Sequence, residues 1–197
     1  MKTADVVADH YRRGRHFLDG GDPASASKAR DEFLAALNVD PTFARAWSGL
    51  SDAYEMLAYV ALLRPEDAHV RARAAAERAL DLDPNLAEAQ VSLATVLLDY
   101  YRDWAGAERH YVAALALDPG YARGRQLYAE LLRDQGRFDE ALAEVDEAVR
   151  LDPLSPYNRL VRGIVFRMAR RYERRWKRSS GCSKPRPTTA WRISTWG

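Results

Sequence analysis

The chain has 197 residues, 47% of them hydrophobic, which is enough for one domain with a buried core. No apolar run approaches the roughly 18 to 20 residues that a transmembrane helix needs, and the N-terminal residues lack the apolar stretch and cleavage site of a secretory signal. The single cysteine, Cys182, excludes an internal disulfide and fits a reducing compartment, so we expect a cytoplasmic protein.

Five Asp-Pro pairs occur along the chain, and the last four follow segments in which apolar residues recur at helical spacing. They are Asp22-Pro23, Asp40-Pro41, Asp83-Pro84, Asp118-Pro119 and Asp152-Pro153. Proline cannot continue the helix before it, and its fixed φ suits the first turn of the next helix, which the Asp oxygen can cap. We therefore predict that each pair ends one helix and starts another.

Alanine stands five and twelve residues before each of the last four of these prolines. Seven residues make two helical turns, so the two alanines share one face, as a close helix crossing requires. The eight alanines are Ala29, Ala36, Ala72, Ala79, Ala107, Ala114, Ala141 and Ala148. In residues 104–153 the pattern of aromatic residue, alanine and Asp-Pro occurs twice, 34 residues apart, and this period indicates a solenoid of helix–turn–helix units.

The pattern resembles the tetratricopeptide repeat (TPR) family, whose repeats place large, small and aromatic residues at fixed positions. The second unit, for example, supplies Trp47, Leu50, Ser51 and Tyr54 in its first helix. The resemblance implies an all-α, right-handed α-solenoid of antiparallel helix pairs, with about four full repeats and a partial fifth within residues 1–173. We place the repeats at about 10–43, 44–86, 87–121 and 122–155, with the partial one at 156–173.

Three places depart from the regular repeat. The first helix of the first unit has His16 and Phe17 where the family has Leu and a small residue. The second unit has nine extra residues, which fall around 57–64 ahead of a new helix start at Pro65. We expect an extended first helix and a longer turn there, either as a lip that contacts a partner or as an insertion packed on its own repeat. In the fourth unit Gly136 is the expected left-handed residue of a tight turn.

The fifth unit begins at the spacing that the repeat predicts, with a helix expected from Pro156 to Ala169. The repeat pattern is lost from Arg175 onward. Reading the coding bases in an offset frame can restore alanine, proline and glycine at the slots of Arg175, Pro187 and Gly197. We therefore predict that residues 174–197 are a non-repeat basic tail, either disordered or the product of a frameshift.

Charge is distributed unevenly along the chain, whose net charge is +2. Residues 1–161 carry a net charge of −8 and residues 162–197 a net charge of +10. Because the positive charge falls in the irregular tail, we do not take it as a sign of nucleic-acid binding. A truncated last repeat would also leave Ile164, Val165 and Phe166 uncovered, which predicts instability or self-association.

Catalytic constellations are missing from the sequence. The four histidines share no ligand spacing and have no cysteine partner, so we expect no metal site. There is no glycine-rich phosphate loop and no nucleophile elbow. We therefore expect no cofactor, no membrane partner and no enzymatic activity, with an enzyme that lacks any recognisable motif kept as an alternative.

The resemblance implies that the first helix of each pair lines a concave groove with its positions 2, 5, 9 and 12. Here these are Arg45, Ser48, Asp52, Glu55, Glu88, Val91, Thr95, Leu98, Arg123, Gln126, Glu130 and Arg133. A bound peptide or partner helix can place an apolar side chain near Val91 and Leu98 and a carboxylate near Arg123 or Arg133. Alternatively, Glu130 and Arg133 pair with each other. The Lys/Asn pattern of chaperone-tail carboxylate clamps is absent.

The amino-acid sequence of several segments is similar to that of TPR regions that follow winged-helix, cyclase or kinase domains in bacterial regulators. The first hypothesis for the function is a scaffold that binds a peptide or a partner protein. The second is a detached or truncated sensory and oligomerisation module of a bacterial transcriptional regulator or kinase.

Overall fold

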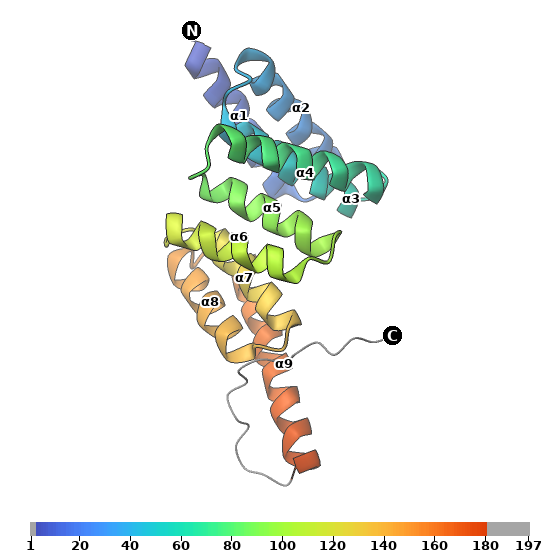
Figure 1. Ribbon diagram of the computed structural model, residues 1–197, viewed down its shortest axis with the longest axis vertical. Coiled ribbons are helices and arrows are strands. Elements are labelled where there is room, and N and C mark those ends of the chain that lie inside the picture. Colours follow the sequence, from blue (N-terminus) through green and yellow to red (C-terminus); the bar gives the residue numbers. More distant parts are fainter. Residues whose placement is uncertain (1–2, 181–197) are drawn as a thin grey trace. The chain divides into compact units, whose positions relative to one another are not determined.

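The computed structural model describes residues 3–180, and within this range it holds nine α-helices and no strand (Figure 1). The helices are α1 (Thr3–Gly20), α2 (Pro23–Val39), α3 (Ala44–Tyr59), α4 (Pro65–Leu82), α5 (Ala87–Asp99), α6 (Trp104–Leu117), α7 (Ala122–Asp134), α8 (Phe138–Leu151) and α9 (Pro156–Ser180). The predicted all-α fold of helix pairs is confirmed. The chain divides after Gly124 into two compact units.

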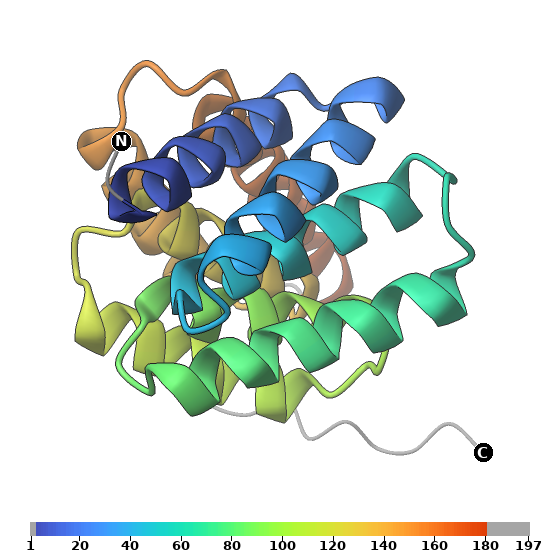
Figure 2. The same ribbon diagram turned by 90° about the horizontal axis from the view of Figure 1, so that it is seen from above.

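Consecutive helices lie next to one another throughout the first unit, from α1 to α6, and α3 also contacts α1 and α5. Figure 2 shows these helices running back and forth beside one another, coloured from blue to green. In the second unit α8 contacts α9, and Arg125 on α7 forms an ion pair of 2.7 Å with Glu144 on α8. Contacts between neighbouring helices hold such a repeat structure together.

The eight alanines that the repeat spacing singles out are all 0% exposed. They lie on α2, α4, α6 and α8, which are the second helices of the pairs. A larger side chain at any of these positions would hold the crossing helices apart, because interiors are packed to near crystal density. The full burial of all eight alanines is what a close helix crossing at these positions requires.

The Asp-Pro pairs end helices as predicted, but only the first of them also starts one. Asp22 caps α2, because its carboxylate accepts hydrogen bonds from the backbone N–H groups of Ala24 (3.0 Å) and Ser25 (3.1 Å). At the other four pairs the prediction of a helix start is wrong. There the Asp backbone N–H closes the preceding helix, as at Asp40, and its carboxylate accepts from the residue two further on, such as Thr42 N–H at 2.9 Å. The proline therefore lies in a turn, and the next helix begins three residues later.

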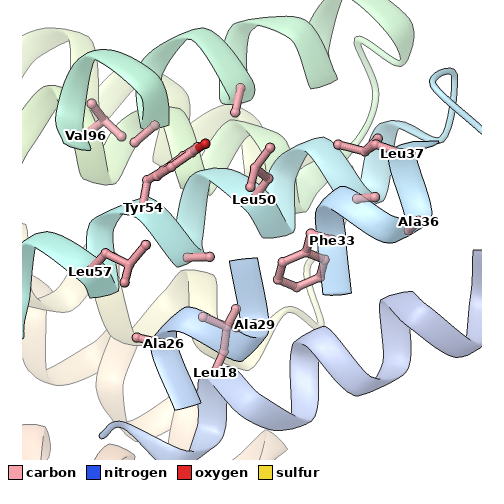
Figure 3. Packing of buried hydrophobic residues seen from close by; sticks show 14 of the residues in the cluster. Leu18, Ala26, Ala29, Phe33, Ala36, Leu37, Leu50, Tyr54, Leu57 and Val96 are labelled. Carbon is pink, nitrogen blue, oxygen red and sulfur yellow. The ribbon is translucent and has the colours of Figure 1, made fainter. Parts of the chain in front are cut away.

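The core of the first unit surrounds Phe33 on α2, whose side chain is fully buried (Figure 3). Two glycines, Gly14 on α1 and Gly49 on α3, lie against its ring. A Cβ atom at Gly14 would lie 2.7 Å from Phe33 Cε1, and one at Gly49 would lie closer still. Although His16 and Phe17 depart from the repeat pattern in α1, Gly14 provides the small residue that lets α1 approach Phe33.

The extra residues of the second unit are shared between α3, the turn after it and α4. Compared with α7 and α8, both helices are longer and the turn at 60–64 is wider. The predicted extended helix, longer turn and start at Pro65 are confirmed. Leu57 is buried in the core, while Tyr59 and Leu62 are exposed. Part of the insertion thus packs on its own repeat and part of it presents apolar surface.

Helix α9 is longer than predicted, because it runs to Ser180 instead of ending at Ala169. In the preceding repeat the turn after α7 depends on Gly136, which has the expected left-handed conformation with φ +77°. The residue 34 positions later is Arg170. An arginine could adopt the left-handed conformation only at an energetic cost, so no turn interrupts α9. The rest of the predicted tail, residues 181–197, and with it most of the frameshift hypothesis, lies outside the described residues.

Val165 on α9 is fully buried, which contradicts the expectation that a truncated repeat leaves it uncovered. It lies on the same side of the helix as Val161, which is also buried, and α9 packs against α8. Phe166 is exposed as expected, and Ile164 is partly buried.

Candidate functional site

The first helices of the first unit meet along one line of polar residues. On α3 and α5 the hydroxyl groups of Ser48 and Ser92 lie 3.0 Å apart and hydrogen-bond in the interior. One turn away along the same two helices, Arg45 forms an ion pair with Glu88. The predicted positions Arg45, Ser48 and Glu88 therefore lie at one contact between helices.

Asp52 on α3 is the centre of this polar line. Its Oδ2 atom accepts hydrogen bonds from Arg15 Nη1 (3.0 Å) and Arg123 Nη1 (2.8 Å), and its Oδ1 atom accepts from Ser92 Oγ (2.8 Å). One carboxylate thus connects α1, α3, α5 and the first turn of α7. We call Asp52, Arg15, Arg123 and Ser92 the Asp52 cluster.

The charge state of the Asp52 cluster follows from its contacts. Burial by itself would raise the pKa of Asp52, but the charges of Arg123 and Arg15 and the hydrogen bond from Ser92 outweigh it and lower this pKa below its usual value. The charge of Asp52 in turn raises the pKa of Arg123. The cluster therefore holds two positive charges around one negative charge at neutral pH.

Two members of the cluster, Ser92 and Arg15, are not among the predicted positions. Arg15 lies on α1, where His16 and Phe17 break the repeat pattern, so no register assigned groove positions to this helix. The only available signal was an arginine on the first helix of a repeat whose neighbour carries Asp52. Such charge complementarity does not say which of the basic residues of α1 reaches across.

The two apolar contacts expected of the groove are not available on the surface. Val91 is 2% exposed and Leu98 is 8% exposed. Val91 packs beside Gly124, at which a Cβ atom would lie 3.2 Å from Val91 Cγ2. Thr95 is partly buried, and its hydroxyl lies 3.0 Å from the carbonyl oxygen of Val91 and 3.2 Å from Tyr111 Oη. Arg45 and Arg123 remain the most exposed of the predicted positions on these helices.

The last predicted position of α3, Glu55, faces α4 and forms a partly buried acid–imidazole pair. Its Oε1 atom lies 2.7 Å from His69 Nδ1, and the His69 ring stacks on Tyr100 with centroids 4.6 Å apart. Burial raises the pKa of Glu55 to about 7, against an opposing effect of the hydrogen bond and charge of His69, and the charges of Asp99 and Asp52 add to the increase.

Glu55→Gln will stabilise the protein at pH 8 and leave its stability nearly unchanged at pH 4. Between the ordinary pKa of 4.5 and the folded value of about 7 the unfolded chain releases the Glu55 proton and the folded chain keeps it, so stability falls as pH rises through this window. The variant removes this penalty, and we expect a gain of about 1–3 kcal/mol at pH 8. Urea titrations at both pH values measure it. The exposed Glu77, changed to Gln, is the control, and a gain of the same size there would contradict the assignment.

The three predicted positions in the second unit bond to one another and to their neighbours on α7. Gln126 is buried and donates a hydrogen bond to Glu130. Arg133 Nη1 lies 3.4 Å from Glu130 Oε2, and Arg133 Nε lies 2.6 Å from Asp134 Oδ1. The alternative in which Glu130 and Arg133 pair with each other is confirmed, so a carboxylate of a partner would have to compete for Arg133.

Among residues 3–180 no group of three or more His, Cys, Asp or Glu side chains is arranged to hold a metal ion. None of the described helices is long and apolar enough to cross a membrane.

Comparison with known families agrees with this architecture. Residues 101–164 match the tetratricopeptide repeat family model, in the part of the sequence where the 34-residue period is clearest. The helix pairs and the buried alanines continue the same pattern on either side of that match. In the matched part the chain resembles the tetratricopeptide repeat family, and its fold is an all-α solenoid of helix pairs.

The chain is also similar to part of a bacterial transcriptional regulator. The transcriptional regulator HilA of Salmonella typhimurium is 25% identical over 143 residues, which cover 73% of this chain and 26% of the regulator. The chain thus spans about a quarter of the length of the curated relatives that it matches.

Solved structures show the same fold. TTC0263, a TPR protein of Thermus thermophilus, superposes with a TM-score of 0.66 at 24% identity, covering 80% of this chain and 79% of its own. A TPR protein of Parabacteroides merdae superposes with a TM-score of 0.51 at 15% identity, covering 85% and 62%. At these identities the likeness concerns the fold alone.

Proposed function

We propose that the protein is a non-catalytic scaffold that binds a peptide or a partner protein on the face formed by α1, α3, α5 and the start of α7. The Asp52 cluster is the observation that carries this proposal. It fixes two arginines from different helices around one carboxylate, and Arg123 and nearby Arg45 are partly exposed. A guanidinium carries five N–H donors in a rigid fork, so an arginine held by Asp52 can also receive a carboxylate of a partner.

Preorganisation supports the same conclusion. Arg15 and Arg123 are long side chains that lose conformational freedom when a ligand immobilises them. Asp52 already holds both guanidinium groups, so a partner that binds there meets them in place. The expected ligand is therefore an acidic or C-terminal carboxylate group flanked by polar residues, since Val91 and Leu98 are buried.

Site-specific photocrosslinking tests the proposed face. A photoreactive phenylalanine analogue is placed in the full chain at Arg45 on α3, and in a second variant at the exposed Arg78 on α4. In cells of the source organism the first variant is expected to yield a discrete crosslinked protein that the second does not yield. A partner captured only from Arg78, or equally from both positions, would place binding elsewhere.

The similarity to HilA favours a second candidate function, a sensory or oligomerisation module of a transcriptional regulator. The matched region covers most of this chain and a minor part of the regulator. The coding sequence upstream of Met1 discriminates the two functions. An in-frame segment that encodes a DNA-binding or kinase domain supports the second, and an unrelated or oppositely oriented gene directly upstream counts against it.

A further inference from the structure

Helix α9 carries a line of apolar side chains that nothing in the described part of the second unit covers fully. Tyr157, Leu160 and Met168 are exposed, and Ile164 is partly buried. Their spacing of three, four and four residues places them on one side of the helix. The neighbouring side of α9 buries Val161 and Val165, and α9 packs against α8. We call Tyr157, Leu160, Ile164 and Met168 the α9 seam.

The repeat itself does not require apolar residues at these positions. Each residue of the α9 seam stands 34 positions after a residue of the preceding repeat, and those residues are Arg123, Gln126, Glu130 and Asp134. All four earlier side chains are polar or charged and form hydrogen bonds or ion pairs within the chain. The α9 seam therefore has apolar side chains where the preceding repeat has polar ones, without a need for core packing.

The part of α9 that carries the seam is also positively charged. Residues 156–172 contain five arginines and no acidic residue. Arg162 forms an ion pair with Asp146 on α8. Helical geometry places Arg167 and Arg171 along one edge of the α9 seam. Among the residues whose side chains the structure describes, no ion pair is found for these two arginines. In Figure 1 the C-terminal part of α9 extends beyond the N-terminal end of α8.

The pattern of the α9 seam selects one class of occupant. Apolar residues at i, i+3, i+7 and i+11 fit the apolar face of another helix. A second copy of α9 would bring ten arginines together across the contact, and this repulsion opposes a symmetric dimer. Duplex DNA offers phosphates to the arginines but no apolar surface to cover Leu160 and Met168.

We propose that the α9 seam binds an acidic amphipathic helix of a partner protein, whose apolar face covers the seam and whose carboxylates face Arg167 and Arg171. This inference rests on the proposed role in protein binding but uses a surface separate from the Asp52 cluster. Arg–carboxylate pairs along the edge set the charge preference, and burial of Leu160 and its neighbours contributes most of the affinity.

Fluorescence anisotropy with the full chain tests the proposal. The probe is a labelled synthetic helix of about 20 residues, with leucines along one face and glutamates elsewhere. A second probe has lysine in place of every glutamate. We expect the acidic probe to bind about tenfold more tightly than the lysine probe, and Leu160→Ser to weaken it about tenfold. Because Leu160 and Val112 on α6 are 57% and 51% exposed, Val112→Ser is the matched control and should bind as the wild type does.

A separate double variant tests the preference of the α9 seam for the acidic probe. Arg167→Glu together with Arg171→Glu should reverse the preference, so that the lysine probe binds more tightly than the acidic one. Circular dichroism shows whether α9 is intact in each variant, and the lysine probe keeps the test meaningful because a misfolded α9 would bind neither peptide.

Four results would overturn the proposal. The first is equal binding of the two probes, and the second is binding of the acidic probe that Leu160→Ser leaves unchanged. The third is a Leu160-dependent association with duplex DNA or with vesicles of phosphatidylserine that is stronger than binding of the acidic probe. The fourth is a dimer in analytical ultracentrifugation that Leu160→Ser dissociates. Crosslinking from Arg45 reports on the Asp52 cluster and does not depend on Leu160, so the proposed function and this inference fail separately.

Discussion

Asp52→Ala will lower the free energy of unfolding by about 3 kcal/mol at pH 7, because it removes the carboxylate that Arg15 and Arg123 both bind. The Asp52 side chain is only 10% exposed, so water restores little of the lost interaction. Urea denaturation followed by circular dichroism measures the change. Asp146→Ala is the control: Asp146 also pairs with an arginine but is 51% exposed, and its removal will cost about 0.5 kcal/mol or less.

The pH dependence of this effect follows from the lowered pKa of Asp52. Its folded pKa lies below the ordinary value of 3.8, so the stabilisation is fully present above that value and is lost as pH falls through the folded pKa. The difference between the wild type and Asp52→Ala is therefore expected to stay constant from pH 7 to about pH 4 and to decrease below it. A loss no larger than that of Asp146→Ala at pH 7 would show that the cluster contributes no more than a surface pair.

Close packing explains which parts of the fold the sequence predicts well. At each helix crossing the backbones approach so closely that only a small residue fits, so Ala29 and Ala36 in the first repeat mark a crossing without reference to other contacts. A proline ends the preceding helix for a reason equally local. The start of the next helix was wrongly placed at four pairs, because the Asp carboxylate has two options, a cap or a turn two residues long, and the local sequence permits both.

The proposed binding face was harder to predict because a position on a helix does not determine what covers it. The register placed Val91 and Leu98 on the line of Asp52 and Arg123, and they share that side of their helices. Their exposure depends on neighbouring helices and on the absence of a side chain at Gly124, which lets the backbone approach Val91. The two arginine partners of Asp52 stand 37 residues before it and 71 residues after it in the sequence, and the 34-residue period alone does not predict these separations.

Gly49→Ala will destabilise the first unit by about 2 kcal/mol, although alanine is the better helix former by about 1 kcal/mol. The added Cβ atom would overlap the ring of Phe33, and the ring cannot move away because Gly14 lies against it as well. Gly163→Ala is the control, because Gly163 also lies in a helix but a Cβ atom added there would meet no described atom within 4 Å. We expect it to stabilise the protein by about 0.5–1 kcal/mol.

A double-mutant cycle with Phe33→Leu identifies the obstacle. If the aromatic ring opposes the new Cβ atom, the cost of Gly49→Ala in the Phe33→Leu background will fall to below about 1 kcal/mol, because leucine leaves room where the ring edge was. Phe33→Leu alone will be destabilising, since it opens a cavity among Leu50, Leu57 and the alanines of α2. An unchanged cost in both backgrounds would show that a group other than the Phe33 ring opposes the new Cβ atom.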